Sequence, residues 1–495
     1  MTAGATAPAG AGVVADVRAL CERAERLAHG GPLAERARAV RERLDGPLRI
    51  ALAGRIKAGK STLLNALVGE RLAATDAGEC TRMVTVYRHA DGYEVSARLR
   101  DGAERRLGFR RVDGALELDL DGLHPDDVEV LDVGWPASVL RRVTLIDTPG
   151  LGSLDEANSR RTVDFLDHDA DTPSGADAVI YLMRHLHRSD AEFLGAFMDR
   201  SVTGASPVNA VAILSRADEV GACRLDALDS ATRIADRYAA DQNVRTLVAT
   251  VGPLAGLLAE TGLTLREPEL AALRELAALP DDEVERLLLS ADDFCEVSAT
   301  PLTAEVRRDL LDRLGMFGAR FALGELRAGT VTTATELSRA LVRRSGLAGL
   351  QELIDTQFVP RGALLQARTA VVALRGLAAE LAAVDPAAAS ALRRDLDELE
   401  AGAVDFAQLQ AAHLVLSGTV PLPAAERAEV ERILTTGDLA AALGVDGAGP
   451  DERRRVALAG IERWRQRASD PLATSLATSV AETMARLHER LYVTG

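Results

Sequence analysis

The sequence contains, at residues 54–61, the stretch Gly54-Arg55-Ile56-Lys57-Ala58-Gly59-Lys60-Ser61. It matches the pattern G-x-x-x-x-G-K-[ST], in which backbone N–H groups surround phosphate oxygens. An apolar run at 48–53 precedes it and a helix-forming run follows it, which is the context that the pattern requires. We therefore predict that Lys60 contacts the β- and γ-phosphates of a nucleotide and that Ser61 binds Mg²⁺. The residues predicted to bind nucleotide in this loop are Gly54, Ala58, Gly59, Lys60, Ser61 and Thr62.

The composition draws attention to the same loop. Lysine and arginine together number 58, yet the only lysines are Lys57 and Lys60. Arginine is too large and flat to replace a compact ammonium between phosphates, which accounts for Lys60.

Composition also excludes several classes of protein. A length of 495 residues indicates two or three domains, and the net charge of −16 argues against nucleic acid as a partner. The four cysteines lie far apart without a CxxC pair, so we expect reduced thiols and no cysteine metal site. No strongly apolar run reaches 18 residues and the first residues do not form a secretory signal, so neither a transmembrane helix nor secretion is expected.

A second motif follows an apolar run at 143–146. It reads Asp147-Thr148-Pro149-Gly150, and the run predicts a strand that delivers Asp147 to the carboxyl edge of a sheet, where such sheets bind ligands. We predict that Asp147 holds Mg²⁺, through water, and that the Gly150 amide faces the γ-phosphate.

The preference for guanine is predicted from a third element. The strand predicted at 210–214 ends in Ser215-Arg216-Ala217-Asp218, which resembles the [NT]-K-x-D element of GTPases. The Asp218 carboxylate can accept two hydrogen bonds from guanine, whereas adenine offers no such pair of donors. Arg216 can stack on the base, as its stem is apolar and its cation flat. Ser298-Ala299, after a strand predicted at 294–297, match a loop whose backbone contacts the guanine carbonyl.

The order of predicted elements indicates the fold. Strands and helices alternate up to about residue 302, with β-hairpins near 88–140, which predicts a mainly parallel α/β sheet. Beyond 303 we expect only long helices, with a restart at Pro471. We therefore predict an α/β P-loop GTPase domain at 47–302 and an elongated helical bundle built from segments 1–46 and 303–495.

With these elements in order, the chain resembles the dynamin-like large GTPases, specifically the bacterial dynamin-like proteins and the actinobacterial type that includes the isoniazid-inducible proteins. The resemblance lies in residues 54–69, in Cys80-Thr81-Arg82 and in 147–151. It implies GTP as substrate, Mg²⁺ as cofactor and a catalytic Thr81 whose hydroxyl binds the metal. It also implies pairing of GTPase domains and remodelling of membranes, from a cytoplasmic position at the inner face of the cell membrane.

The chain departs from the better-known dynamins at two positions. Those proteins carry Gln and Ser where this chain has Ile56 and Lys57. The Gln helps to orient the attacking water, which Ile56 cannot do, and the Ser helps to hold a monovalent cation. We hypothesise that the Lys57 ammonium is a catalytic group that takes the place of that cation. A solvated loop cation is the alternative for Lys57.

A contact with lipid has one main candidate in the sequence. Residues 413–423 are uncharged and largely apolar and lie at a predicted helix–helix turn, so an exposed tip there could enter the headgroup region. A buried turn is the alternative. The arginines of 453–455 and 463–467, with Trp464, are a second candidate, and a solvated helix face is its alternative. The predicted tip residues are Leu414, Val415, Leu416, Val420 and Leu422.

Three alternatives to a membrane-remodelling GTPase remain at this point. One is a GTP-dependent regulatory switch or assembly factor whose helical half binds a protein. Another is an ATPase, which Asp218 disfavours. A third is an assembly partner of a second dynamin-like protein that itself hydrolyses GTP poorly, which the Ile56 departure leaves open.

Overall fold

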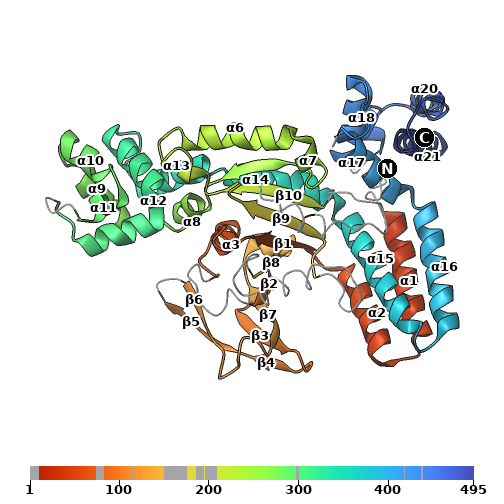
Figure 1. The fold of residues 1–495 in the computed structure, drawn as a ribbon, viewed down its shortest axis with the longest axis horizontal. Helices are drawn as coiled ribbons and strands as arrows, with labels where there is room; N and C mark the ends of the chain where they lie inside the picture. Colours follow the sequence, from red (N-terminus) through yellow and green to blue (C-terminus); the bar gives the residue numbers. More distant parts are fainter. Residues whose placement is uncertain are drawn as a thin grey trace.

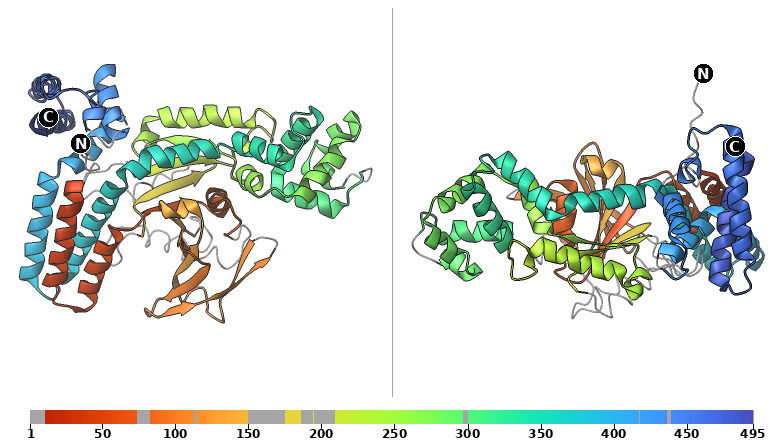
Figure 2. Two further views of the ribbon diagram at one scale, coloured as in Figure 1. Left: turned by 180° about the vertical axis from the view of Figure 1, so that it is seen from behind. Right: turned by 90° about the horizontal axis from the view of Figure 1, so that it is seen from above.

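The computed structural model describes residues 11–73, 83–112, 115–149, 175–185, 194, 209–296, 300–416, 418–435 and 439–494. Its centre is a nine-stranded sheet with the strand order β11-β10-β9-β1-β8-β2-β7-β3-β4 (Figure 1). Two helical bodies lie at opposite ends of this sheet, as the views in Figure 2 show from two further directions.

Five strands on one side of the sheet run parallel, and they form the half that carries the sequence motifs. Their side chains are almost all buried, because long apolar runs are covered by helices on both faces. The parallel strands are β1 (Leu48–Gly54), β8 (Val143–Asp147), β9 (Ala178–Met183), β10 (Ala210–Ser215) and β11 (Val251–Leu254).

The other half of the sheet holds the predicted hairpin region. β2 pairs antiparallel with β8 and parallel with β7, and β3 and β4 extend the sheet in antiparallel fashion. A separate hairpin pairs β5 with β6. The α/β fold with a mainly parallel sheet is therefore confirmed. These strands are β2 (Val84–His89), β3 (Glu94–Leu99), β4 (Glu104–Arg106), β5 (Gly108–Val112), β6 (Ala115–Asp119) and β7 (Val128–Trp135).

Helix α7 (Gln242–Arg245) precedes the edge strand β11. One predicted strand is wrong. The strand predicted at 294–297 is replaced by helix α11 (Ala291–Glu296), in which Phe294 is fully buried. A short apolar run does not distinguish a strand from a buried helix, and acidic residues in the first turn of α11 favour the helix.

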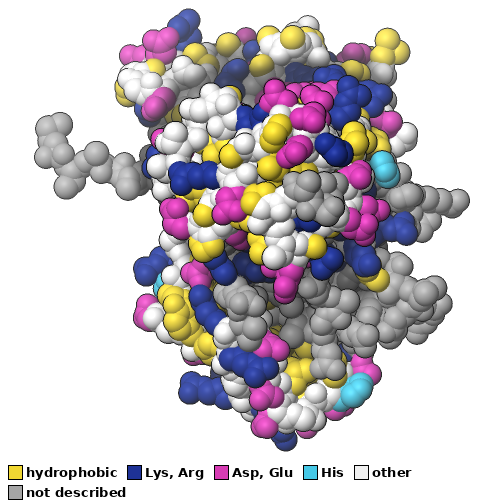
Figure 3. All heavy atoms as spheres, turned by 90° about the vertical axis from the view of Figure 1, so that its left-hand side faces the viewer, with side chains coloured by type: hydrophobic (Ala, Val, Ile, Leu, Met, Phe, Trp, Pro, Cys, Tyr) yellow, Lys and Arg dark blue, Asp and Glu magenta, His cyan; other side chains and the backbone are white. Residues whose placement is uncertain are grey.

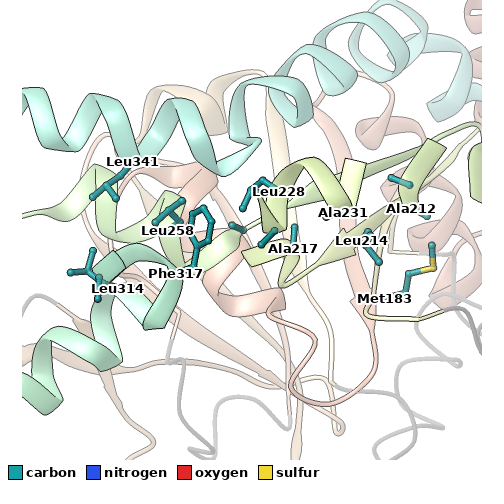
Figure 4. Packing of buried hydrophobic residues seen from close by; sticks show 14 of the residues in the cluster. Met183, Ala212, Leu214, Ala217, Leu228, Ala231, Leu258, Leu314, Phe317 and Leu341 are labelled. Carbon is teal, nitrogen blue, oxygen red and sulfur yellow. The ribbon is translucent and has the colours of Figure 1, made fainter. Parts of the chain in front are cut away.

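The first helical body packs beside β10 and β11. Phe317 and Leu314 of α12 meet Leu258 of α8 and Leu341 of α13 in the same core as Leu214 of β10 (Figure 4). Helix α12 is broken at Gly315, whose φ of 63° is open mainly to glycine. The helices of this body and of the two faces of the sheet are α3 (Lys60–Val68), α6 (Ala227–Ala240), α8 (Gly256–Thr264), α9 (Glu267–Ala277), α10 (Asp281–Leu287), α12 (Ala304–Arg327), α13 (Ala334–Ser345) and α14 (Leu347–Leu353).

Helices α12 and α13 share a core with the sheet. The trunk has a separate core, to which the C-terminal half of the chain contributes from Leu364 onward. On the face of the molecule formed by the first helical body, basic and acidic side chains are intermixed (Figure 3).

The trunk is built from both sides of the sheet domain. Helices α1 and α2 pack against α15 and α16, and Val17, Cys21 and Leu374 lie in their shared core (Figure 1). Asp385 caps α16 by accepting hydrogen bonds from the backbone N–H groups of Ala387 and Ala388. The bundle helices are α1 (Ala11–Leu27), α2 (Gly31–Arg43), α15 (Gly362–Leu381) and α16 (Pro386–Gly402).

The C-terminal helices form a further layer on the trunk. The predicted break at Pro471 is confirmed, because α20 ends at Ala468 and α21 begins at Ser475. Along α21 the apolar seam from Val480 to Leu491 is buried, whereas Leu472, in the turn before the helix, is 92% exposed. These helices are α17 (Val404–Leu416), α18 (Ala424–Thr435), α19 (Leu439–Ala442), α20 (Pro450–Ala468) and α21 (Ser475–Thr494).

The exposed tip predicted at 413–423 is wrong. Leu414, Val415 and Val420 are buried in the trunk core and Leu422 packs against it. These apolar side chains therefore point into the trunk and do not form an exposed tip. The side chain of Leu416 lies outside the described residues. Gly418 lies beside α7, where an added Cβ would be 3.3 Å from Gln242 Oε1.

Four arginines of the two arginine-rich segments form ion pairs with glutamates of the same chain. Arg455 pairs with Glu452, Arg463 with Glu429, Arg465 with Glu489 and Arg467 with Glu426. Trp464 is fully buried and donates a hydrogen bond to Glu429, so it is no interface anchor. Among the helices of the described ranges, none is long and apolar enough to cross a membrane.

Candidate nucleotide-binding site

The loop at 54–59 joins the end of β1 to the start of α3. Gly54 has a φ of 146°, and a Cβ there would lie 2.3 Å from the backbone oxygen of Leu182 in β9. Only glycine fits this approach between neighbouring strands. Gly59 also has a positive φ, 93°, and so does Lys57 at 61°, although it carries a side chain. The loop therefore has the backbone shape that lets amides turn inward.

Lys60 lies folded over this loop. Its side chain is buried, and its ammonium donates to the backbone oxygens of Gly54 at 3.3 Å and of Arg55 at 3.4 Å. Burial lowers the pKa of Lys60, and the nearby charge of Asp147 opposes that shift. The ammonium is thus placed where phosphate oxygens can replace the two carbonyl contacts.

Asp147 stands at the carboxyl end of β8, as predicted. Its Oδ2 accepts a hydrogen bond of 2.8 Å from Ser61 Oγ, so the two predicted metal ligands are in contact. Burial raises the pKa of Asp147, an effect that Lys60 and Ser61 oppose. Its Oδ1 is buried and has no hydrogen-bond partner in the part of the chain that the structure describes. An unpaired carboxylate oxygen beside a hydroxyl is the hard-oxygen donor set that Mg²⁺ prefers, so these residues fit that ion.

Thr148 was not predicted to contribute, yet it ties the two motifs together. Its hydroxyl donates a 2.8 Å hydrogen bond to the backbone oxygen of Leu52 in β1. This bond fixes the end of β8 against the strand that leads into the phosphate loop. The Asp-Thr-Pro-Gly motif could have predicted this bond, because the hydroxyl of a threonine at a buried strand end needs a hydrogen-bond partner.

The two residues that depart from the dynamin pattern are exposed. Ile56 is 47% exposed and Lys57 is exposed next to it on the loop. No hydrogen bond or ion pair of Lys57 is found among the described residues.

The predicted base-binding residues follow β10. Ser215 Oγ donates to the backbone oxygen of Met183 at 3.2 Å, which ties β10 to β9. Arg216 has a φ of 52° and pairs with Glu219 at 2.6 Å. Glu219 also lies 3.3 Å from Arg184, which follows β9. The sequence prediction missed this acidic bridge between two arginines, because Arg184 and Glu219 meet only through adjacent strand ends.

Asp218 is buried beside this bridge. Burial is the main cause that raises the pKa of Asp218 to about 6. The break in α12 lies close to it, since a Cβ at Gly315 would be 3.7 Å from Asp218 Oδ2. In its ionised form this carboxylate can accept two hydrogen bonds at once, so it is suited to recognising the paired N–H groups of guanine.

Four predicted residues lie outside the described residues. They are Thr81, Gly150, Ser298 and Ala299. The remaining predicted nucleotide-binding residues lie at or just after the carboxyl ends of β1, β8 and β10. In the sheet β1 lies next to β8, and β9 lies between β1 and β10. The arrangement places the loop at 54–59, the contact between Ser61 and Asp147 and the carboxylate of Asp218 along one edge of the sheet.

The chain is similar in sequence to several known proteins. The family described as the dynamin family matches residues 50–202. Isoniazid-induced protein IniC of Mycobacterium tuberculosis is 40% identical over 456 residues, which cover 91% of this chain and 90% of that protein. The bacterial dynamin-like protein of Nostoc punctiforme is 33% identical over 125 residues, or 23% of this chain and 18% of that protein.

A similarity to a solved structure is looser. A chain from an oligomerised bacterial dynamin pair is 13% identical, and the match covers 98% of this chain and 74% of that chain with a TM-score of 0.33.

Proposed function

The chain belongs to the dynamin family, whose members are GTPases, and from this membership we propose that it hydrolyses GTP to GDP and phosphate. The observation that carries the proposal is the 2.8 Å hydrogen bond between Ser61 Oγ and Asp147 Oδ2. It joins the phosphate loop to the second motif beside the buried ammonium of Lys60.

In this reaction water attacks the γ-phosphorus, and the bond from that phosphorus to the β,γ-bridging oxygen breaks. The Lys60 ammonium leaves its carbonyl contacts and neutralises charge on the β- and γ-phosphate oxygens. Ser61 and Asp147 would hold Mg²⁺, which supplies positive charge to the same oxygens. Asp218 accepts hydrogen bonds from guanine, and Arg216 covers the base.

Thr81 is assigned to the proposed site from the family resemblance, and the remaining residues are assigned from the sequence motifs and from the departure at Lys57. Thr81 would be the metal-binding catalytic threonine, and Gly150, Ser298 and Ala299 would offer backbone groups to the γ-phosphate and the base. The exposed ammonium of Lys57 would stabilise the charge of the transition state in place of a monovalent cation.

We extend the proposal to nucleotide-dependent self-association and peripheral binding of membrane lipid at the inner face of the cell membrane. Family membership supports both, and a second dynamin-like protein is a further proposed partner. Since Leu414, Val415 and Val420 are buried, the proposed lipid contact moves to Leu472, an almost fully exposed leucine in the turn between α20 and α21.

A second candidate function is a GTP-dependent switch that assembles with another dynamin-like protein. The exposed Ile56 favours it, because an apolar side chain at this place cannot orient the attacking water.

One experiment separates these proposals. GTP turnover is measured with Mg²⁺ at several protein concentrations, with and without liposomes that contain anionic lipid, and lipid co-sedimentation is measured in parallel. Specific activity that rises with protein concentration supports pairing of GTPase domains, and lipid binding that Leu472→Asp removes supports the proposed contact. GTP binding with neither turnover nor lipid binding would favour the switch. Absence of GTP binding would contradict both functions.

A further inference from the structure

A loop with unusual backbone angles leaves the turn that carries Asp218. Three residues in a row, Gly221, Ala222 and Cys223, have positive φ angles of 63°, 62° and 58°. Left-handed backbone is unfavourable for residues that carry a Cβ, and such residues keep it only where the surrounding structure holds them. The loop begins three positions after Asp218. The contacts that hold the loop therefore bear on the shape of the proposed base site.

The loop is held by Arg320, which belongs to the second half of α12. Its Nη1 donates hydrogen bonds to the backbone oxygens of Ala222 at 2.9 Å and of Cys223 at 2.7 Å. Its Nη2 donates to the backbone oxygen of Leu288, just after α10, at 2.7 Å. Because a guanidinium is planar and rigid, one side chain fixes three carbonyl groups relative to α12. The loop is thus attached to the first helical body.

Helix α12 also meets the turn at Asp218 directly. A Cβ on Gly315 would lie 3.7 Å from Asp218 Oδ2, so the break in the helix lies against this carboxylate. Ala217, the residue before Asp218, is buried in the same core as Phe317 of α12 (Figure 4). The turn and the loop that follows it therefore contact the same helix.

The thiol of Cys223 reports on this contact. A hydrogen bond joins it to the backbone of Phe317. Burial is the main cause that raises the pKa of this thiol, and the negative charges of Asp218 and Glu219 raise it further. The thiol is therefore close both to α12 and to these two acids, and it is only partly exposed. Its reactivity towards an alkylating reagent measures whether the loop keeps this position.

Arg327 of the same helix makes a similar contact away from the base site. It donates hydrogen bonds to the backbone oxygens of Ala277 at 3.2 Å and of Leu279 at 2.9 Å, and it pairs with Asp281. These partners lie at the end of α9 and the start of α10. Loss of Arg327 therefore removes a comparable anchor within the first helical body and leaves the loop at 221–223 in place.

We propose that Arg320 is a positioning residue for guanine recognition, which holds the loop at 221–223 so that the Asp218 carboxylate keeps its direction towards the base. This inference rests on the proposed GTPase function, in which Asp218 accepts two hydrogen bonds from guanine. Two such bonds need the carboxylate in one fixed orientation, whereas the phosphate contacts belong to other strands. Loss of Arg320 therefore weakens guanine binding and leaves kcat at saturating GTP nearly unchanged.

The test compares GDP with inosine diphosphate, which differs from GDP only because its base lacks the exocyclic amine. The ratio of the two Kd values measures the hydrogen bond from that amine to the protein. It is determined for the full chain as wild type, Arg320→Ala, Asp218→Ala, the double variant and the matched control Arg327→Ala. Measured in parallel are kcat at saturating GTP, thermal unfolding and the rate at which Cys223 is alkylated, followed by mass spectrometry of its peptide.

We expect Arg320→Ala to raise the Kd for GDP about tenfold and to lose most of the preference for GDP, with less than about a threefold change in kcat. Cys223 should be alkylated faster by about threefold or more. Arg327→Ala should lower thermal stability but change neither the preference nor the alkylation rate. The double variant should be no worse than Asp218→Ala, because Arg320 acts through that carboxylate. If Arg320→Ala does not fold, Arg320→Lys, whose ammonium keeps donors for the carbonyl groups, should show the same changes at smaller size.

Three results would overturn the inference while the wild-type protein still prefers GDP. They are an unchanged preference in the Arg320 variant, an equal loss of preference in Arg327→Ala, and losses that add to that of Asp218→Ala. A wild type that binds neither diphosphate, or both equally, would instead contradict the proposed guanine site, and the inference with it. The alkylation rates would still show whether Arg320 holds the loop.

Discussion

Ser61 Oγ and Asp147 Oδ2 lie 2.8 Å apart, although 86 positions separate the two residues in the sequence. The contact exists because β1 and β8 are parallel neighbours in the sheet, so that their carboxyl ends meet. The other carboxylate oxygen of Asp147 is buried without a partner in the described structure. These two observations predict how the site depends on a divalent cation.

We predict that Asp147→Asn lowers GTP turnover by about a hundredfold or more, because it removes the charge that would hold Mg²⁺. It should also raise the Mg²⁺ concentration needed for half-maximal activity. Folding should be preserved, since burial raises the pKa of the native carboxylate and a neutral amide avoids that cost. Turnover titrated with Mg²⁺ and thermal unfolding of both proteins check this. An unchanged Mg²⁺ requirement would remove Asp147 from the metal site.

We predict that GTP affinity depends on pH through Asp218. Burial raises the pKa of this carboxyl to about 6, and guanine needs its ionised form, so affinity should fall by up to about tenfold per pH unit below 6. In the free protein the sign is opposite. The folded state favours the protonated acid, so that contribution to stability is present at low pH and is lost as the pH rises through about 6.

Asp218→Asn is the control for both effects. It should abolish the pH dependence of GTP binding, weaken GTP and favour xanthosine triphosphate, whose second carbonyl accepts from the new amide. Affinity measured between pH 5 and 8 for both proteins checks this. A wild-type affinity that is constant over that range would contradict the assignment.

Much of this site was predictable from sequence, because each motif residue follows an apolar strand and the carboxyl ends of parallel strands meet. The pairing of Ser61 with Asp147 is an example. The strand predicted at Phe294 failed because a short apolar run carries no periodicity, and the predicted tip failed because Val415 and Val420 look equally apolar in a buried turn and in an exposed one. The contact between Glu260 and Arg71 was out of reach for another reason. It joins Glu260 of α8 to Arg71, which follows α3 in the chain, and only tertiary packing brings the two residues together.

We predict that Gly54→Ala destabilises the fold as well as the site. The new Cβ would lie 2.3 Å from the Leu182 oxygen at a φ of 146°, so β1 and β9 would have to separate. A loss of roughly 2 kcal/mol or more in the free energy of unfolding is expected. Gly349→Ala is the matched control, since that helical glycine has open space around its Cβ, and it should raise stability by about 0.5 kcal/mol. Urea unfolding of the two variants checks this, and equal midpoints would contradict the close approach at Gly54.

We predict that Lys57→Ala lowers kcat and makes the remaining activity depend on potassium. The Lys57 side chain is exposed on the phosphate loop and has no partner among the described residues, so its ammonium can approach a bound phosphate without breaking a contact. Removal of a charge that acts in the transition state should cost about tenfold to a hundredfold in kcat with little change in GTP affinity. Potassium should restore part of the loss if the cation occupies the same place. Turnover in potassium and in a bulky organic cation, compared with Arg55→Ala as a neighbouring loop variant, checks this. If Lys57→Ala leaves both the rate and the potassium response unchanged, Lys57 is a solvated cation, and the transition-state charge is offset by other groups of the site.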